Sequence, residues 1–339
     1  MRMLQTLQAG RAFAALAVVV HHTAQSTDAF VGAMPAAART AADLGYLGVD
    51  FFFVLSGFII YYTTYADERK PIDSKVFLWR RLVRIFVPYL PIGVGMMAMY
   101  LLLPGLSAAE RDWSLLSSLT LIPTGGPPAL SVAWTLQHEL VFYLLFALLL
   151  ATGRIALGLW IWSAMIVAAW AIGLNSERPL SVLFGLINLE FGMGVLAAMA
   201  VAKRKQISTP VLLAAAIAAF TAFSISGERE HSVLFGAGIA FTLVPLCRAE
   251  LAGRIDVPSG LVLLGNASYA LYLIHNPLLS ITSRAVASVT HQWWINLLVG
   301  VLISVIASLA YHLLFERWAL RTLNSLMQKR VALVARPAS

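Results

Sequence analysis

The sequence predicts an all-α, polytopic integral membrane protein: a bundle of about ten transmembrane helices with both termini in the cytoplasm. Three observations lead to this prediction. Of the 339 residues, 60% are hydrophobic and 12% are charged, whereas a soluble domain carries about 25% charged residues. Apolar windows long enough to span a bilayer recur along the whole chain. The basic residues fall in short clusters between these windows.

The apolar windows have the length and composition of membrane-spanning helices. In chain order they cover residues 7–27, 44–66, 84–104, 133–152, 155–174, 180–202, 210–226, 231–247, 260–283 and 293–318. There is no internal repeat or low-complexity tract, so we expect a single membrane domain over residues 1–339. The first window resembles a signal peptide, but two histidines end its apolar run. We therefore expect it to be retained as a helix.

The basic residues predict the orientation. With the N-terminus in the cytoplasm, 19 of the 24 Lys and Arg residues lie in cytoplasmic segments. The five on the other side are Arg39, Arg111, Arg178, Arg229 and Arg284. This asymmetry follows the positive-inside rule and supports an even number of spans with both ends inside. The same distribution excludes nucleic acid as a partner, because apolar spans separate the charges that make up the net +8. Membrane lipid is the expected surrounding.

Two segments between the windows have their own character. Residues 74–89 read SKVFLWRRLVRIFVPY and follow a possible helix start at Asp73. Helical spacing alone favours an interfacial helix that contacts anionic lipid. Residues 104–132 contain several prolines and glycines. Because such a stretch cannot continue a helix, we expect it to fold back as a loop or short interfacial turn.

The first window contains an unusual pair, Arg11 and His22. At 100° per residue, their separation of 11 positions leaves them about 20° apart around the helix axis and about 16 Å apart along it. His21 points about 80° away from Arg11, so His22 is the histidine that shares the face of the arginine. Such groups are costly in lipid and are expected to face a bundle interior or a polar cavity.

Three further titratable groups lie inside apolar windows. Asp50 and Glu139 are each about six residues from the outer end of their windows, which places them about 9 Å below the outer surface. His22 and His275 reach the outer half of the membrane by the same measure. We therefore expect these four groups to share one depth. A carboxylate on one imidazole nitrogen would raise the basicity of the other, which suits proton transfer.

The arginines are expected at the opposite, inner face, where Arg11 would meet Arg80, Arg81 and Arg84. Guanidinium groups pair bidentately with phosphate, so this cluster suits a phosphorylated, membrane-impermeant molecule. A donor with a phosphate head and a long, thin arm could span the roughly 16 Å to His22. Coenzyme A thioesters have this shape.

Structural interpretations compete with these functional ones. A single intramembrane His or Asp often serves only as an interhelical hydrogen bond. His138, His291 and His312 have no aligned partner and are interpreted as interfacial or structural. Glu316–Arg317 fits equally an ion pair that closes the bundle and a functional group.

Small residues and the single cysteine also have simple interpretations. The Ser56-Gly57 pair and the Gly192-x-Gly194 pattern are interpreted as positions of close helix packing. Cys247 is the one cysteine, which excludes an intramolecular disulfide and a Cys-rich metal site. No metal is expected, because the histidines show neither an i, i+4 pair nor an HExxH spacing.

Six segments in order carry a family resemblance. They are RAFAALAVVVHH (Arg11 to His22), YLGVDFFFVLSGF (Tyr46 to Phe58), RRLVRIFVPY (Arg80 to Tyr89), WTLQHELVFY (Trp134 to Tyr143), SYALYLIHNP (Ser268 to Pro277) and Phe315-Glu316-Arg317. Together they resemble the membrane-bound acyltransferase 3 family, and within it the exopolysaccharide-production acetyltransferase branch. The resemblance runs nearly end to end. One departure is His21, where other members commonly carry an apolar residue.

The resemblance implies transfer of an acyl group, usually acetyl, from cytoplasmic acyl-CoA to a carbohydrate hydroxyl. The acceptor would be a cell-surface polysaccharide or its lipid-linked precursor, at the bacterial inner membrane. Acetyl-CoA would be a co-substrate, with its phosphates held by Arg11, Arg80, Arg81 and Arg84. His22 would be the catalytic base or a transient acyl carrier. The residues assigned to orient it are Glu139 or Asp50, and those assigned to the acceptor are His275, Tyr269 and Trp134.

Two other classes of function remain at this stage. A proton-coupled transporter or flippase of a glycan precursor also uses intramembrane carboxylates and histidines. Transporters often carry internal repeats with matching broken helices, and neither is detected here. A structural scaffold for polysaccharide assembly would leave the alignment of Arg11 with His22 unexplained.

Overall fold

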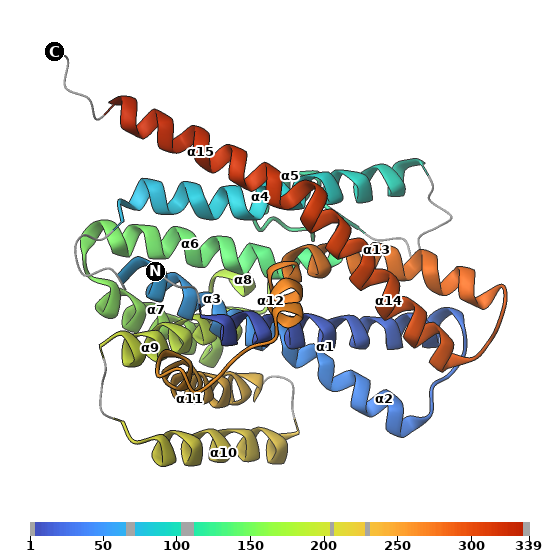
Figure 1. Ribbon diagram of the computed structural model, residues 1–339, viewed down its shortest axis with the longest axis horizontal. Helices are drawn as coiled ribbons and strands as arrows, with labels where there is room; N and C mark the ends of the chain where they lie inside the picture. The colour runs from blue at the N-terminus through green and yellow to red at the C-terminus, as the bar shows by residue number, and fades with distance from the viewer. Residues whose placement is uncertain (1–3, 66–71, 103–111, 204–206, 228–230, 335–339) are drawn as a thin grey trace.

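The structure is a computed structural model that describes residues 4–65, 72–102, 112–203, 207–227 and 231–334, with side chains as far as residue 326. Every regular element in these ranges is a helix (Figure 1). Seven helical stretches in the same ranges are long and apolar enough to cross a membrane: Ala36–Tyr65, Ser74–Leu102, Ser131–Thr152, Leu180–Ala202, Thr209–Ser226, Ser232–Leu251 and Trp293–Leu326. The predicted class, an all-α multi-pass membrane protein, is confirmed. The count of ten spans and the cytoplasmic termini remain predictions.

Each predicted window falls on one helix or on consecutive helices. The first half of the chain forms α1 (Gln5–Phe30), α2 (Ala36–Asp43), η1 (Leu44–Leu47), α3 (Gly48–Tyr65), α4 (Ser74–Leu102), α5 (Leu115–Thr120), η3 (Ser131–Ala133), α6 (Trp134–Thr152) and α7 (Ile155–Ala171). The second half forms α8 (Leu180–Leu183), η4 (Leu186–Asn188), α9 (Leu189–Ala202), α10 (Thr209–Ser226), α11 (Ser232–Leu251), α12 (Ser259–Asn266), α13 (Ser268–Ala287), α14 (Trp293–Tyr311), the π-helical turn η6 (His312–Glu316) and α15 (Arg317–Val334).

The first helix, α1, is enclosed by other helices. It packs against α3, α12, α13 and α14 and lies across the middle of the view in Figure 1. Small or branched side chains such as Ala12, Ala15 and Val19 are at most 1% exposed. These neighbours receive the polar side chains of α1, so a charge on this helix need not face lipid.

Glycines allow α3 and α9 to approach each other closely. A Cβ on Gly57 would lie 2.0 Å from the carbonyl oxygen of Phe191, and one on Gly194 would lie 1.8 Å from that of Val54. Any side chain at either position would therefore separate the helices. The packing interpretation is confirmed for these two glycines, whereas a Cβ on Gly192 would meet its nearest atom only at 3.9 Å.

The segment 74–89 is not a separate interfacial helix. It is the first half of α4, which continues to Leu102 through Pro88 and Pro91. The two prolines lack backbone N–H groups, and neighbouring helices supply hydrogen bonds in this region. The hydroxyl of Tyr269 donates to the carbonyl of Ile85 (3.0 Å), and that of Tyr311 donates to the carbonyl of Pro88 (2.9 Å).

The segment before α6 folds back into the protein, as predicted for its described part, residues 112–132; residues 104–111 lie outside the described ranges. After α5 the chain is buried at Leu121 and Leu130. Serine side chains satisfy its backbone: Ser117 Oγ donates to the carbonyl of Ile122 (2.9 Å), and Ser118 Oγ accepts from the N–H of Ala129 (2.8 Å). As a result, α6 begins near the middle of the long axis of the molecule in Figure 1 rather than at its end.

Candidate active site

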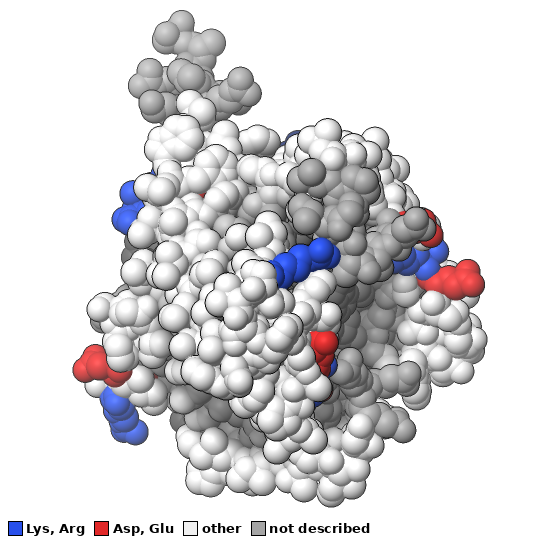
Figure 2. Space-filling model, turned by 90° about the vertical axis from the view of Figure 1, so that its right-hand side faces the viewer, with Lys and Arg blue, Asp and Glu red and all other residues white. Residues whose placement is uncertain are grey.

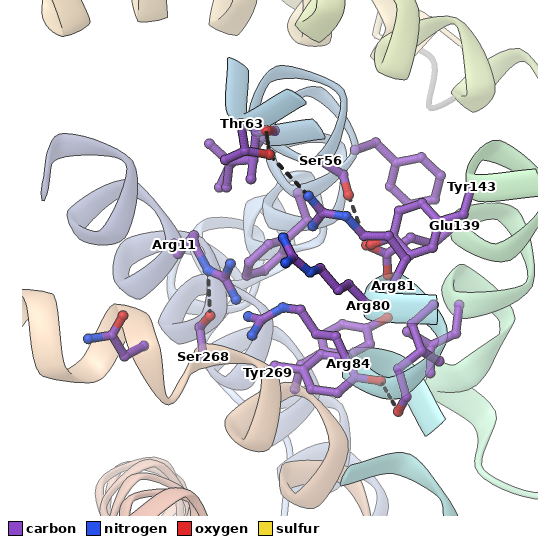
Figure 3. Close-up of a pocket in the computed structure, with 18 of the residues that line it drawn as sticks. Arg11, Ser56, Thr63, Arg80, Arg81, Arg84, Glu139, Tyr143, Ser268 and Tyr269 are labelled. Carbon is purple, nitrogen blue, oxygen red and sulfur yellow. Dashed lines mark hydrogen bonds between the residues drawn. The ribbon is translucent and has the colours of Figure 1, made fainter. Parts of the chain in front are cut away.

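A cavity of about 690 Å³ is lined by residues of α1, α3, α4, α6, α12, α13 and the segment from η6 to α15. Its most unusual feature is six arginines, Arg11, Arg80, Arg81, Arg84, Arg317 and Arg321. Four of them are the cluster predicted at the inner face. In Figure 3 the guanidinium groups of Arg11, Arg80 and Arg84 point toward one another across the cavity. We call this space the arginine cavity.

The helices fix two of these arginines through side-chain contacts. Arg11 Nε donates to the hydroxyl of Ser268 at 3.0 Å, across the contact of α1 with α13. Arg81 donates to the hydroxyl of Thr63 at 3.2 Å, and its guanidinium lies 5.6 Å from the ring centroid of Phe77 and 5.8 Å from that of Tyr143. Spacing along α4 brings Arg84 to the same side as Arg80 and Arg81.

The charge of this cavity is largely uncompensated. Within the described residues, none of the six arginines forms an ion pair with a carboxylate. Glu139 is the one carboxylate in the described lining of the cavity. Like charges held together in a partly enclosed space repel, and a bound anion relieves that repulsion. The arrangement therefore suits a ligand with several negative charges, such as a polyphosphate.

Glu139 lies in the arginine cavity rather than beside His22. Its Oε1 accepts from Ser56 Oγ at 2.8 Å and from the hydroxyl of Tyr143, one turn along α6 (Figure 3). The predicted depth is corrected here: the buried loop before α6 brings Glu139 to the level of the arginines of α4. Counting from the end of an apolar window had placed this carboxylate at the depth of His22 and His275 instead.

The two predicted histidines do meet. His275 Nε2 lies 3.2 Å from His22 Nδ1, and their ring centroids are 5.0 Å apart. His275 Nδ1 lies 2.9 Å from the carbonyl of Leu271, which can only accept, so this nitrogen carries the proton and Nε2 is the acceptor of a neutral ring. His22 Nδ1 faces that acceptor and the carbonyl of Val18 at 3.0 Å, so it is a donor.

This hydrogen-bond pattern assigns the tautomer of His22. With its proton on Nδ1, a neutral His22 has its lone pair on Nε2, which makes no hydrogen bond within the described residues. An imidazole in this state can accept a proton from a substrate. The group that contacts His22 Nδ1 is therefore His275 rather than Glu139 or Asp50.

A second, smaller cavity of about 210 Å³ contains His22 in its wall. The remaining lining comes from the second half of α1, the last turns of α4, residues Leu130 and Ser131, and α13 from Asn276 to Ser280. We call this space the histidine cavity. Arg11 and His22 thus each line a cavity, at separate positions along one helix.

A thin layer of protein separates the two cavities. Tyr272 lines the arginine cavity, and its ring centroid lies 5.9 Å from that of His275. Its hydroxyl bonds the Thr135 hydroxyl at 2.9 Å and the Val132 carbonyl at 3.0 Å. Ser268, Tyr272 and His275 follow the spacing i, i+4, i+7 and share one face of α13. This face connects the partner of Arg11 with the partner of His22.

The other predicted site residues lie elsewhere. Asp50 is 2% exposed and lies close to the buried Glu190 of α9. Tyr269, assigned to the acceptor, lines the arginine cavity instead. Trp134 lines neither cavity; its ring centroid lies 6.5 Å from that of Phe53 and 5.6 Å from that of His138.

Three other histidines have polar contacts of their own, apart from the His22–His275 pair. His21 Nδ1 lies 3.3 Å from Asp43, and its Nε2 lies 3.0 Å from the amide of Gln25, so it faces away from His275. His138 bonds Asn188 at 2.9 Å, in agreement with a structural role. His312 was also interpreted as structural, but it lines the arginine cavity, with Nδ1 at 2.8 Å from Glu316.

Sequence reasoning missed the polar lining of the histidine cavity. Gln25 and Ser26 lie three and four residues after His22, on its side of α1. Asn276 and Ser280 follow His275 on α13. Helical spacing from His22 was the available signal for Gln25 and Ser26, whereas Asn276 and Ser280 lie one and five residues after His275 and do not share its face.

Comparisons with known proteins identify the family of this chain. A sequence profile described as an acyltransferase domain, that of the acyltransferase 3 family, matches residues 4–313. The chain is 28% identical over 301 residues to the exopolysaccharide production protein ExoZ of Rhizobium meliloti (strain 1021). That alignment covers 82% of this chain and 90% of the relative. No solved structure matches the chain.

Proposed function

Because the chain belongs to the acyltransferase 3 family and is an O-acyltransferase, we propose that it moves an acetyl group from acetyl-CoA to a carbohydrate hydroxyl. The acceptor is a cell-surface polysaccharide or its lipid-linked precursor, and the enzyme resides in the bacterial inner membrane with the donor on the cytoplasmic side. The relative named for exopolysaccharide production supports a carbohydrate acceptor. The observation that carries the proposal is the cluster of six arginines without a carboxylate ion pair among the described residues.

The arginine cavity fits the head of coenzyme A. Its phosphates would be held by Arg11, Arg80, Arg81 and Arg84, with Arg317 and Arg321 as further cations in the lining. The cavity volume of about 690 Å³ lies in the range of sites that take small-molecule ligands. To reach His22, about 16 Å from Arg11 along α1, the uncharged arm has to pass the buried side chains of Tyr272 and His275, so the proposed transfer requires the layer between the cavities to open.

His22 is the general base of the proposed reaction. Nε2 takes the proton of the acceptor hydroxyl as its oxygen attacks the thioester carbonyl. The carbon–sulfur bond breaks, and the thiolate leaves and is protonated by the imidazolium. His275 holds the tautomer of His22 that this step requires. Glu139 belongs to the donor side, where it limits the net positive charge.

The test is transfer by the purified protein in lipid nanodiscs, with radiolabelled acetyl-CoA and polysaccharide from a strain that lacks the gene. Wild type is expected to release CoA and label the glycan. His22→Ala is expected to lower kcat by about 10² to 10⁴, the usual contribution of a general base, with acetyl-CoA binding retained. His291→Ala, at an exposed histidine outside both cavities, is the matched control.

Two outcomes contradict the proposal. Unchanged kcat in a correctly folded His22→Ala variant would remove the general base from the mechanism. Movement of an unlabelled glycan across a membrane, with no acetylated product from wild type, would favour the transporter or flippase class instead.

A further inference from the structure

The histidine cavity has a lining without charge. Its described wall consists of His22, Gln25, Ser26, Ala29, Phe30, Met96, Met99, Tyr100, Leu130, Ser131, Asn276, Pro277 and Ser280. None of these is Asp, Glu, Lys or Arg, in contrast to the six arginines of the other cavity. A cavity of this kind recognises a neutral, hydroxyl-bearing ligand better than an ionised one, because its described wall holds no charged side chain to pair with a buried charge. Arg284 lies outside this wall and packs on Phe30, with its guanidinium 4.7 Å from the ring centroid.

Several polar groups in this wall have unused hydrogen-bonding capacity. The Ser26 and Ser280 hydroxyls form no hydrogen bond within the described part of the chain. Asn276 uses one amide hydrogen, donated to Ser131 Oγ at 2.6 Å, which leaves its other N–H and its carbonyl oxygen. These donors and acceptors come from two helices and surround the space beside His22.

The cavity also has apolar contacts and a defined face of α1. His22, Ser26, Ala29 and Phe30 lie at i, i+4, i+7 and i+8, which is one side of a helix. Phe30 and Tyr100 add aromatic surface, and Met96 and Met99 of α4 add flexible apolar surface. Hydroxyl-binding groups beside apolar side chains match the mixed surface of a sugar ring, which has polar edges and apolar C–H faces.

Size and location point to one sugar residue of a longer chain. The volume of about 210 Å³ is below the roughly 300–1,000 Å³ of sites that enclose a drug-sized ligand. The cavity is lined by the ends of α1 and α4, toward the end of the molecule that faces the viewer in Figure 2. The arginine cavity is lined by the beginnings of the same two helices.

We propose that the histidine cavity is the acceptor site and that it binds a neutral sugar residue, with Asn276 and Ser280 positioning the hydroxyl that reacts at His22. This inference rests on the proposed acetyl transfer. It replaces the acceptor residues assigned from motifs, Tyr269 and Trp134, with residues of the histidine cavity. An acidic sugar such as a uronic acid residue is not acetylated at this site.

The experiment compares Asn276→Ala and Ser280→Ala with wild type, using polysaccharide purified from a strain that lacks the gene. Each variant is expected to raise the acceptor KM about fivefold to tenfold, as for the loss of one hydrogen bond, and to leave the acetyl-CoA KM within about twofold. Ser288→Ala is the matched control, at an exposed serine just beyond the end of α13 and outside both cavities. NMR of the product is expected to show the acetyl group on a neutral residue.

The outcomes separate this inference from the proposed function. If wild type acetylates the polysaccharide while both variants keep the wild-type acceptor KM, or the acetyl group lies on a uronic acid residue, the acceptor assignment is overturned and the transferase remains. If Asn276→Ala loses CoA binding, its fold is damaged, and Ser280→Ala, which removes one hydroxyl without a described hydrogen bond, decides. Retained donor binding with a raised acceptor KM then supports the site, and an unchanged acceptor KM overturns it. Absence of transfer by wild type overturns both proposals.

Discussion

Replacing Arg84 with glutamine is the cleanest test of the donor site. Arg84 lines the arginine cavity but makes no hydrogen bond or ion pair within the described residues, so its loss removes no described polar contact of the fold. Arg81, in contrast, bonds Thr63 and contacts two aromatic rings. A change at Arg84 therefore reports on the ligand, whereas a change at Arg81 also perturbs packing.

The expected loss of acetyl-CoA affinity in Arg84→Gln follows from the contact with phosphate that is lost. A hydrogen bond to a charged group contributes about 1.5–3 kcal/mol. A loss of about 2 kcal/mol corresponds to about thirtyfold weaker binding of acetyl-CoA. Arg84→Glu adds repulsion from the phosphates and is expected to weaken binding further. Added salt should reduce the wild-type affinity more than that of either variant, because fewer charges remain to be screened.

Isothermal titration calorimetry with CoA, together with the acetyl-CoA KM, measures this effect. Arg154→Gln is the control, at an exposed arginine beside α7 and outside both cavities. Affinities of Arg84→Gln and Arg84→Glu within about twofold of wild type would refute phosphate binding by this cluster.

Other expected outcomes concern the fold and the histidine pair. Gly194→Ala should destabilise the protein and lower its yield, because the new Cβ would lie 1.8 Å from the Val54 carbonyl oxygen. Gly192→Ala is the control, because its Cβ would meet the nearest atom only at 3.9 Å. Equal thermal stability of the two variants would contradict the packing argument. His275→Ala should lower kcat about tenfold or more with little change in acetyl-CoA KM, because His22 loses the acceptor that fixes its tautomer. His275→Gln, which retains an acceptor, should recover part of kcat; no difference between the two His275 variants would argue against tautomer control.

The sequence predicted the helices and the cluster of arginines for clear physical reasons. Apolar windows require helices in a membrane, and positions along one helix determine which side chains share a face. Arg80, Arg81 and Arg84 therefore had to lie near one another on α4. The matching phase of Arg11 and His22 correctly indicated that both would face protein cavities.

The depth of a side chain in the bundle and its partners on other helices could not be predicted from apolar windows and helical spacing. Glu139 was misplaced because the buried loop before α6 moves the start of that helix inward, and hydropathy does not report where a loop lies. The pairing of Asp50 with Glu190 depends on how α3 packs against α9. The histidine cavity depends on three separate segments meeting, and serines or amides in apolar helices do not identify such a meeting on their own.

The layer at Tyr272 has a consequence for membrane voltage. In the proposed arrangement the arginine cavity opens to one side of the membrane and the histidine cavity to the other, so most of the transmembrane field would fall across the short stretch between them. Moving a unit charge through that field costs or gains about 2.3 kcal/mol per 100 mV. The acetyl group and the arm that carries it are neutral, whereas the phosphates stay among the arginines. In the proposed reaction the transferred group therefore passes the barrier without electrical work, and we expect turnover to be independent of the membrane potential.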